Sequence, residues 1–194
     1  MSDADEDLVQ RAVDGDRSAF TQLMERHERR VYNLCLRMVG DLDDASDATQ
    51  DAFLTAYRRL SSFRGEAAFT TWLHRVAVNA SYDLLRKRGR APVLTFSDDR
   101  PVEEERVAPA PDHADETTDA IEMQRALLAI PEEFRAALVL HDAQDVPVQQ
   151  VADILGVPVG TVKSRLHRGR VALARALGVG EPEQGERPSK GRIR

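Results

Sequence analysis

The chain has 194 residues, of which 42% are hydrophobic and 31% are charged, and its formal net charge is −6. This composition predicts a soluble protein that is large enough for one or two small domains. No apolar run approaches the ~20 residues that span a bilayer, and the acidic start does not resemble a secretory signal. We therefore expect a cytoplasmic protein that does not insert into a membrane.

Charge is distributed unevenly along the chain. Residues 1–16 hold six acids and one base, residues 41–51 hold five acids and no base, and residues 91–119 hold nine acids and two bases. Residues 64–90 hold six bases and two acids, and residues 157–177 hold five bases and no acid. A protein with one face for DNA and another for a basic protein surface would show this segregation.

Residues 5–90 are predicted to be helical throughout, because apolar residues recur mostly at three- and four-residue steps. Gly-Asp pairs at 15–16 and 40–41 interrupt the pattern and predict helix boundaries. The available N-caps of the helices that follow are Asp16 or Ser18 and Asp43 or Asp44.

Residues 45–60 are predicted to form one amphipathic helix. Its inward face holds Ala45, Ala48, Thr49, Ala52, Phe53, Ala56, Tyr57 and Leu60. The neighbouring stripe consists of Asp47, Gln50, Asp51, Leu54 and Arg58. Carboxylates beside an exposed leucine suit a protein contact better than a nucleic-acid contact, because they repel phosphate. On these residues alone, an ordinary solvated helix face is the alternative.

Residues 61–90 combine a loop with a second predicted helix. The inward stripe of that helix holds Phe69, Trp72, Leu73, Val76, Ala77, Ala80 and Leu84, and another face holds Asn79, Asp83, Arg86 and Lys87. The loop from Phe63 to Ala68 has the aromatic and small residues of a pocket for an unstacked base, with phosphates on the nearby cations Arg86 to Arg88. Alternatively, those cations only stabilise the end of their helix.

Residues 91–118 contain four prolines, many acids and no helical period, which is typical of a linker. Helical periodicity resumes at Asp119 and continues to about Leu177. The sequence therefore predicts an all-α fold with two helical domains, residues 1–90 and 119–178. An acidic flexible linker, residues 91–118, joins them, and a disordered tail, residues 179–194, follows.

Residues 148–170 have the pattern of a helix-turn-helix. A small residue, Ala152, is followed by Gly156 at the turn and by Val162 in the second helix. The outward residues of that helix are Thr161, Lys163, Ser164, Arg165 and Arg168. Such a helix reads base edges with its first residues and holds phosphate with later cations. The alternative is a basic surface helix in a bundle.

The sequence carries no recognisable catalytic or metal-binding motif. Its histidines lack HxxxH or HExxH spacing, and the single cysteine, Cys35, lies among apolar residues that indicate a buried packing position. We expect no cofactor and no metal, and we expect a protein that is not an enzyme.

Taken in order, these segments resemble the extracytoplasmic-function sigma factors, the minimal class of bacterial sigma-70-family initiation factors. The resemblance covers roughly residues 5–178 and is similar in character to the actinobacterial sigma-M group. It is carried by WLHRVAVNASYDLLRK, by IPEEFR and by GTVKSRLHRGR, which is close to the usual GTVKSRLxRAR. Such a resemblance implies binding to core RNA polymerase, recognition of promoter DNA at −35 and −10, and DNA melting, in a stress or signal-dependent regulon.

The resemblance also implies roles for individual residues. The resemblance implies that the β′ clamp helices of the polymerase are contacted by Asp47, Gln50, Asp51, Leu54 and Arg58. Contact with −10 DNA falls to Phe63, Arg64, Gly65, Phe69, Asn79, Asp83, Arg86, Lys87 and Arg88. Contact with −35 DNA falls to Thr161, Lys163, Ser164, Arg165 and Arg168. The β flap and an anti-sigma factor are further implied partners.

Three departures from the family pattern put the −35 preference in question. Val148 replaces an aromatic residue, and Gln149 and Gln150 replace acids. Gly169 stands where alanine is commoner, and glycine costs ~1 kcal/mol of helix stability relative to alanine.

Two rival interpretations of the whole chain stay open. One is a helix-turn-helix regulator with a helical effector or dimerisation domain, and the other is a helical adaptor without nucleic-acid function.

Overall fold

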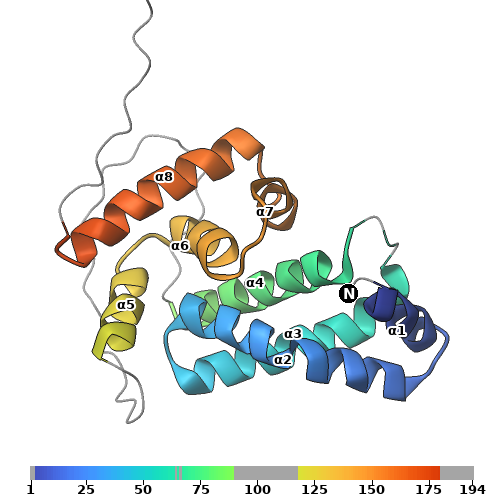
Figure 1. Cartoon of the computed structure of the whole chain (residues 1–194). Helices are drawn as coiled ribbons and strands as arrows, with labels where there is room; N and C mark the ends of the chain where they lie inside the picture. The colour runs from blue at the N-terminus through green and yellow to red at the C-terminus, as the bar shows by residue number, and fades with distance from the viewer. Residues whose placement is uncertain (1–2, 64, 66, 90–117, 180–194) are drawn as a thin grey trace, which may run out of the picture.

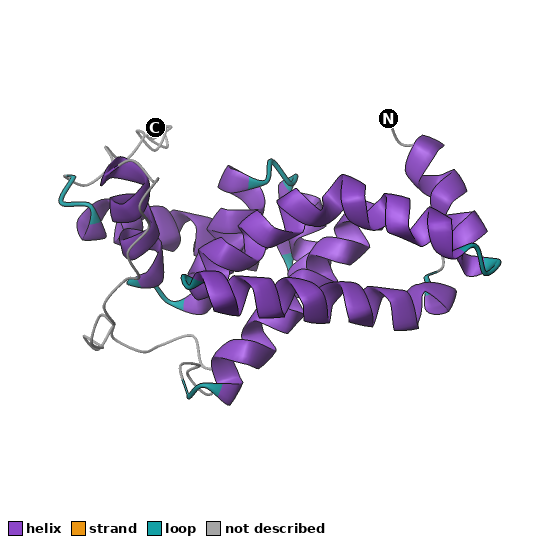
Figure 2. Ribbon diagram, turned by 90° about the horizontal axis from the view of Figure 1, so that it is seen from below, coloured by secondary structure: helices purple, strands orange, loops and turns teal. Residues whose placement is uncertain are grey.

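A computed structural model describes residues 3–63, 65, 67–89 and 118–179 of the chain. The described residues form helices joined by turns, without a strand (Figure 2). The predicted linker, residues 91–118, lies outside the described residues except for Thr118, which begins α5, and the predicted tail, residues 179–194, lies outside them except for Val179. The all-α prediction is confirmed.

The first four α-helices form one bundle, here called the N-terminal bundle. They are α1 (Asp3–Val13), α2 (Arg17–Val39), α3 (Leu42–Arg59) and α4 (Phe69–Lys87), with a short 3-10 helix, η1 (Leu60–Ser62), after α3. α2, α3 and α4 all contact one another, and α1 packs mainly on α2. Their shared core is fully buried at Leu23, Leu34, Met38 and Leu73.

The remaining helices form the C-terminal bundle. They are α5 (Thr118–Leu128), α6 (Glu132–Leu138), a π-helical turn η2 (Val139–Ala143), α7 (Val148–Leu155) and α8 (Val159–Ala176). α8 packs against α6 and α7 and lies on the side of this bundle that is remote from α2 and α3 (Figure 1). The turns that the sequence predicts near Pro131, Pro147 and Gly156 are confirmed.

The helix boundaries of the N-terminal bundle follow the two Gly-Asp pairs. Asp16 caps α2, because its carboxylate accepts hydrogen bonds from the backbone N–H groups of Ser18 and Ala19. Gly40 ends α2 in the left-handed conformation, with φ 82°. Asp41 then caps α3, so the expectation that Asp43 or Asp44 would do so is wrong. The left-handed glycine ends α2 so abruptly that the residue directly after it takes the cap position.

The two bundles pack directly on each other. The guanidinium of Arg135 on α6 is buried and donates hydrogen bonds to the carbonyl of Met38, in the last turn of α2, and to those of Leu128 and Ile130. Gln124 donates to the carbonyl of Leu36 at 3.0 Å. One continuous hydrophobic cluster therefore runs through both bundles. The sequence predicts two domains but does not predict this contact.

The inward stripe predicted for α3 is confirmed except at Tyr57, which is 47% exposed and rests edge-on against Phe20, with ring centroids 4.9 Å apart. On α4 the buried face is wider than predicted and includes Val78, Ser81 and Leu85. The reason is that α4 lies between α2 and α3 on one side and α7 on the other, so it is covered over most of its circumference.

Candidate polymerase and promoter interface

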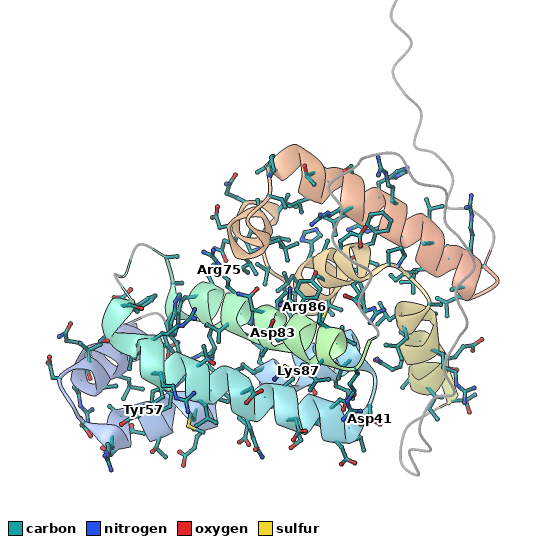
Figure 3. The ribbon with its side chains drawn as sticks, turned by 180° about the vertical axis from the view of Figure 1, so that it is seen from behind. Asp41, Tyr57, Arg75, Asp83, Arg86 and Lys87 are labelled. Atoms are coloured by element: carbon teal, nitrogen blue, oxygen red, sulfur yellow. The ribbon has the colours of Figure 1, made fainter. Side chains whose placement is uncertain are left out.

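The acidic stripe of α3 lies on the surface, as predicted. Asp47, Gln50, Asp51, Leu54 and Arg58 are all exposed, and Leu54 is 51% exposed despite its apolar side chain. Tyr57 lies one turn after Leu54 and widens the apolar part of this face (Figure 3). An exposed leucine and tyrosine among carboxylates form a surface that suits a protein partner and disfavours phosphate. We call these six residues the α3 face.

The loop between η1 and α4 rests on a cluster of aromatic rings. The centroid of Phe63 lies 6.0 Å from that of Phe69 and 5.4 Å from that of Trp72. His27 of α2 joins the cluster 5.6 Å from Phe69. Phe63 is half-buried, whereas Phe69 is 5% exposed and therefore supports the loop from beneath. Gly65 has φ 70°, and Arg64 lies outside the described residues.

A cavity of about 990 Å³ opens beside this loop. Phe63 and Phe69 are among its lining residues, although Phe69 is only 5% exposed. Its cations, however, come from α2 and not from the end of α4. Among the described residues they are Arg26, Arg29, Arg30 and Arg37, and Asp5, Glu6 and Asp145 add carboxylates to the same lining.

The expectation that Arg86 to Arg88 lie near the loop is therefore wrong, and their contact with phosphates stays a prediction. Those residues lie at the far end of α4, about 25 Å along the helix from Phe69 at 1.5 Å per residue. The sequence places both groups in one segment of some 25 residues, but the helix between them is rigid and keeps them apart.

The outer face of α4 carries a separate row of polar side chains. Asn79, Asp83, Arg86 and Lys87 are exposed, as predicted, and Arg75 extends the row toward the loop (Figure 3). Asp83 and Arg86 form an ion pair with each other. The sequence reasoning missed Arg75, although its position four residues before Asn79 places it on the same face.

Arg88 serves a different contact. Its guanidinium forms an ion pair with the carboxylate of Asp44, whose side chain is fully buried in the first turn of α3. A buried carboxylate without a cation would be costly, so Arg88 ties the end of α4 to the start of α3. Its predicted contact with DNA would have to share this guanidinium.

α7 and α8 form the predicted helix-turn-helix. Gly156 ends α7 in the left-handed conformation with φ 67°, which is the unusual backbone angle that the motif needs at its turn. Val162, Leu166 and Gly169 are buried, while Lys163 and Arg168 are exposed. Thr161, Ser164 and Arg165 are half-buried. The hydroxyl of Ser164 donates to the carbonyl of Thr161 at 2.9 Å.

Packing explains why a glycine, which has low helix propensity, stands at position 169 within α8. A Cβ at this position would lie 3.0 Å from the side chain of Leu138 and 3.3 Å from the Cβ of Phe134, both on α6. The missing side chain therefore lets α8 approach α6 closely. Its cost in helix propensity is offset by this contact.

The two helices predicted to read DNA come near each other at Tyr82 of α4. Burial raises the pKa of the Tyr82 phenol to about 12, and Arg165 of α8 is near enough to oppose that rise. Arg86 similarly counters the raised pKa of Glu132 on α6, which burial causes. In this arrangement the C-terminal bundle therefore lies next to cations and aromatic groups of α4.

Two histidines lie beneath the loop. Burial, together with smaller contributions from Arg30 and His27, lowers the pKa of His74 to about 4. Burial also lowers the pKa of His27, whose Nε2 donates to the Asp5 carboxylate at 2.9 Å. Both rings are therefore neutral near pH 7. Cys35 is buried, and its desolvation raises the pKa of the thiol, as a packing residue requires.

The described residues contain no group of three metal-ligating side chains. Within those same residues, no helix has the length and apolar character needed to cross a membrane.

Comparison with known proteins shows the family to which the chain belongs. Residues 23–91 match the family described as Sigma-70 region 2, and residues 120–173 match Sigma-70, region 4. The ECF RNA polymerase sigma factor SigM of Mycobacterium tuberculosis is 43% identical over 175 residues, which cover 90% of this chain and 85% of that protein. The chain belongs to the extracytoplasmic-function sigma factors.

Other relatives agree. The ECF RNA polymerase sigma factor SigW of Bacillus subtilis is 32% identical, over 87% of this chain and 94% of that protein. The sigma factor RpoE of Bartonella quintana, solved in complex with the anti-sigma factor NepR, is 28% identical with a TM-score of 0.65 over 82% of this chain and 97% of that one. The fold of CnrH, solved with the cytosolic domain of CnrY, matches with a TM-score of 0.67 at 24% identity, over 90% of this chain and 97% of that one.

Membership of this family makes the chain a non-catalytic initiation factor that binds core RNA polymerase and promoter DNA. The N-terminal bundle contains sigma region 2, and the C-terminal bundle contains sigma region 4. The resemblance to extracytoplasmic-function sigma factors that the sequence indicates is confirmed.

Proposed function

We propose that this sigma factor divides its contacts by charge among three surfaces. The α3 face docks on the β′ clamp helices of RNA polymerase, the loop and outer face of α4 bind the −10 element, and α8 binds the −35 element. The observation that carries this proposal is the exposed face of α8, where Lys163 and Arg168 lie in a helix without any acid. By contrast, the α3 face holds two carboxylates against the single cation Arg58, beside Leu54 and Tyr57, so its net negative charge disfavours DNA.

Each surface belongs to one functional segment in this proposal. Residues 1–90 bind core polymerase and open the −10 region, and residues 119–178 bind the −35 region and the β flap. Residues 91–118 connect the two segments, and residues 179–194 form a tail. DNA opening then needs no hydrolysis, because holding an extruded base offsets the few kcal/mol of its unstacking.

We further propose a cytoplasmic location, a stress or signal-dependent regulon, and control by an anti-sigma factor. The anti-sigma proposal is supported by the relatives CnrH and RpoE, which were solved with CnrY and NepR. In this chain, direct packing of the bundles brings Arg165 near Tyr82. A partner that stabilised this packing would keep the two DNA-reading surfaces from engaging separated promoter elements.

In vitro transcription with and without core polymerase tests the main proposal. We expect promoter-specific transcripts only with both components, and weak promoter binding by the isolated chain. Lys163→Ala combined with Arg165→Ala should abolish −35-dependent initiation, whereas Arg17→Ala with Arg125→Ala, two exposed cations elsewhere, should not. Tight, specific duplex binding by the isolated chain would instead support an ordinary helix-turn-helix regulator.

The docking face has its own test. Asp51→Arg should weaken association with core polymerase in a pull-down while the fold is retained, and Glu25→Arg, an exposed acid on α2, is the matched control. Equal retention of both variants by core polymerase would exclude Asp51 from the interface.

Promoter opening separates the −10 assignment from general DNA affinity. Asn79→Ala should reduce the permanganate reactivity of unpaired thymines in the holoenzyme–promoter complex more than it reduces duplex binding. Permanganate reactivity equal to that of the wild type would contradict a role for Asn79 in opening.

A further inference from the structure

We propose that the ion pair between Asp142 and Arg170 sets the orientation of α8 on the C-terminal bundle. Arg170 is then a positioning residue for −35 recognition and does not itself contact DNA. The inference rests on the proposed function, in which α8 binds the −35 element. It concerns one of the five cations of residues 157–177, a segment whose charge alone favours contact with phosphate.

The ion pair has the geometry of a two-point contact. The guanidinium of Arg170 donates from Nε to one carboxylate oxygen of Asp142 at 3.0 Å and from Nη2 to the other at 2.7 Å. Two such hydrogen bonds fix the direction of both side chains, which a single contact between charges does not do. The partners are 28 positions apart in the chain, so the pair joins α8 to η2.

The segment that carries Asp142 is itself held in place. η2 is a π-helical turn, a rare conformation that occurs frequently at functional sites. Nδ1 of His141, the residue before Asp142, lies 2.9 Å from the carbonyl oxygen of Val146. Two residues after Asp142, Gln144 donates to the backbone carbonyl of Arg30 on α2 at 3.4 Å. Asp142 therefore offers α8 a fixed point of attachment.

The pair lies at the edge of the buried stripe of α8. That stripe consists of Val162, Leu166 and Gly169, and Gly169 allows the close approach to α6. Hydrophobic contacts are not directional, so they oppose rotation of the helix about its own axis only weakly. Arg170 follows Gly169 directly and lies about 100° further round the helix, at 3.6 residues per turn. Its pair with Asp142 opposes this rotation.

Rotation of α8 would move the side chains that the proposed function assigns to the −35 element, among them Lys163 and Arg168. Hydrogen bonds to base edges depend on angle as well as on distance. Electrostatic attraction to phosphate carries no such sequence information and needs no exact direction. Loss of the ion pair should therefore reduce discrimination between −35 sequences more than it reduces overall affinity for DNA.

The sign of the effect at Asp142 separates positioning from simple electrostatics. Asp142 is an acid on the bundle that binds DNA, so on charge alone its removal should strengthen the attraction to phosphate. If its carboxylate positions α8, its removal should instead weaken −35 recognition. Arg170→Gln should weaken recognition as well, without changing the number of phosphate contacts.

Binding of the holoenzyme to promoter DNA tests the proposal. The probe is a fragment that the wild-type holoenzyme transcribes from sheared genomic DNA, with its −35 region either intact or scrambled. Filter binding at several salt concentrations gives Kd for both forms, and their ratio is the −35 preference. Asp142→Asn and Arg170→Gln should each lower this preference about fivefold, at the low end of what one base contact provides. The double variant should lower it no further, because both single changes remove the same contact.

Matched variants separate the possible causes. Asp153→Asn removes another exposed acid, on α7, and should keep the full preference. Arg168→Gln should lower the slope of log K against log salt by about 0.9, the value for one lost phosphate contact on duplex DNA, whereas Arg170→Gln should leave the slope unchanged. The side chains of Asp142 and Arg170 are 40% and 51% exposed, so their neutral variants should fold, and thermal melting checks this.

Three results would overturn the inference while leaving the proposed function intact. The first is a −35 preference of Asp142→Asn that equals or exceeds that of the wild type. The second is a salt slope lowered as much by Arg170→Gln as by Arg168→Gln, which would make Arg170 a phosphate contact. The third is a loss in the double variant equal to the sum of the single losses. A wild-type holoenzyme that binds intact and scrambled fragments equally would instead contradict the proposed function, and this inference with it.

Discussion

Two helices of the N-terminal bundle start by a different means from α6, α7 and α8, whereas α4 follows Ala68 without a side-chain cap. In the N-terminal bundle, the carboxylates of Asp16 and Asp41 cap α2 and α3. In the C-terminal bundle, α6, α7 and α8 follow Pro131, Pro147 and Pro158, and none of these helices has a side-chain cap. A capping carboxylate neutralises the positive end of a helix dipole, whereas proline leaves it unneutralised. α7 and α8 also lack acids in their first turns, so the helix-turn-helix presents no negative charge there to DNA phosphate.

The bundles also differ in what their packing requires. Long helices in the N-terminal bundle bury Leu23, Leu34 and Met38 among one another. The C-terminal bundle has shorter helices and relies on a close approach at Gly169 and on the buried Arg135. Because Arg135 reaches the carbonyl of Met38, the smaller bundle depends partly on the larger one.

The largest effect is expected at Arg135. Arg135→Ala removes three hydrogen bonds from a buried guanidinium and leaves carbonyl oxygens of both bundles without donors. We expect a loss of about 3–5 kcal/mol in the free energy of unfolding, measured in urea. Arg125→Ala, at an exposed position on α5, should change it by less than about 0.5 kcal/mol. Similar losses in the two variants would show that Arg135 does not support the contact between the bundles.

His74 makes the N-terminal bundle sensitive to acid. The pKa of about 4 in the folded protein lies below the ordinary histidine value of 6.5, so the unfolded chain binds a proton more readily between these values. The stabilising contribution is therefore present above pH 6.5 and is lost as the pH falls toward 4. The loss amounts to about 3 kcal/mol at 1.36 kcal/mol per pKa unit.

His74→Leu removes this proton-binding group from the core. Urea unfolding at pH 7 and pH 4 should show a smaller loss of stability for this variant than for the wild type, by about the same 3 kcal/mol. His167→Leu, at an exposed position on α8, is the control. Identical pH dependence of His74→Leu and the wild type would mean that His74 is accessible to protons in the folded protein.

Gly40 is constrained from both bundles. It needs a left-handed backbone to end α2, and a Cβ there would lie 2.3 Å from the side chain of Leu128 on α5. Gly40→Ala should therefore cost about 2–3 kcal/mol, from backbone strain and from the clash. In a Leu128→Ala background the same substitution should cost only about 1–2 kcal/mol, because the strain alone remains. An unchanged cost in the double-mutant cycle would place the whole effect in the backbone.

The sequence predicts features that depend on neighbouring residues of the chain better than features that depend on contacts between distant residues. The apolar period of α3 and of α8 fixes which side is buried, because that pattern is local. Tyr57 is assigned to the wrong side because its ring suits an inward position, while its hydroxyl tolerates the surface. The contact of Arg135 with Met38 joins residues 97 positions apart, and no local pattern encodes it.

The arginines of α2 that line the cavity beside the loop show the same limit at the candidate site. Arg29, Arg30 and Arg37 are interspersed with Glu25, Glu28 and apolar residues, so no run of charge marks them in the sequence. They line one cavity together with Phe63 and Phe69, which come at least 26 positions later in the chain, so this grouping depends on tertiary packing. The basic face of α8, in contrast, arises within one helix and is visible directly in the sequence.

The smallest effect tests the difference in helix caps. Asp41 accepts a hydrogen bond from the backbone N–H of Asp44 at 3.0 Å, at the start of α3 (Figure 3). Asp41→Ala should lower the free energy of unfolding by about 1 kcal/mol, while Asp41→Asn, which retains a capping oxygen, should change it by a few tenths of a kcal/mol.

Pro158→Ser adds a capping hydroxyl to α8 but removes the proline that restricts the unfolded chain. These effects are each about 0.5–1 kcal/mol and opposite in sign, so the net change should be small. A gain of 1 kcal/mol or more in Pro158→Ser would mean that α8 forgoes a stabilising cap. That result would favour selection for an uncapped helix end at the DNA-binding surface.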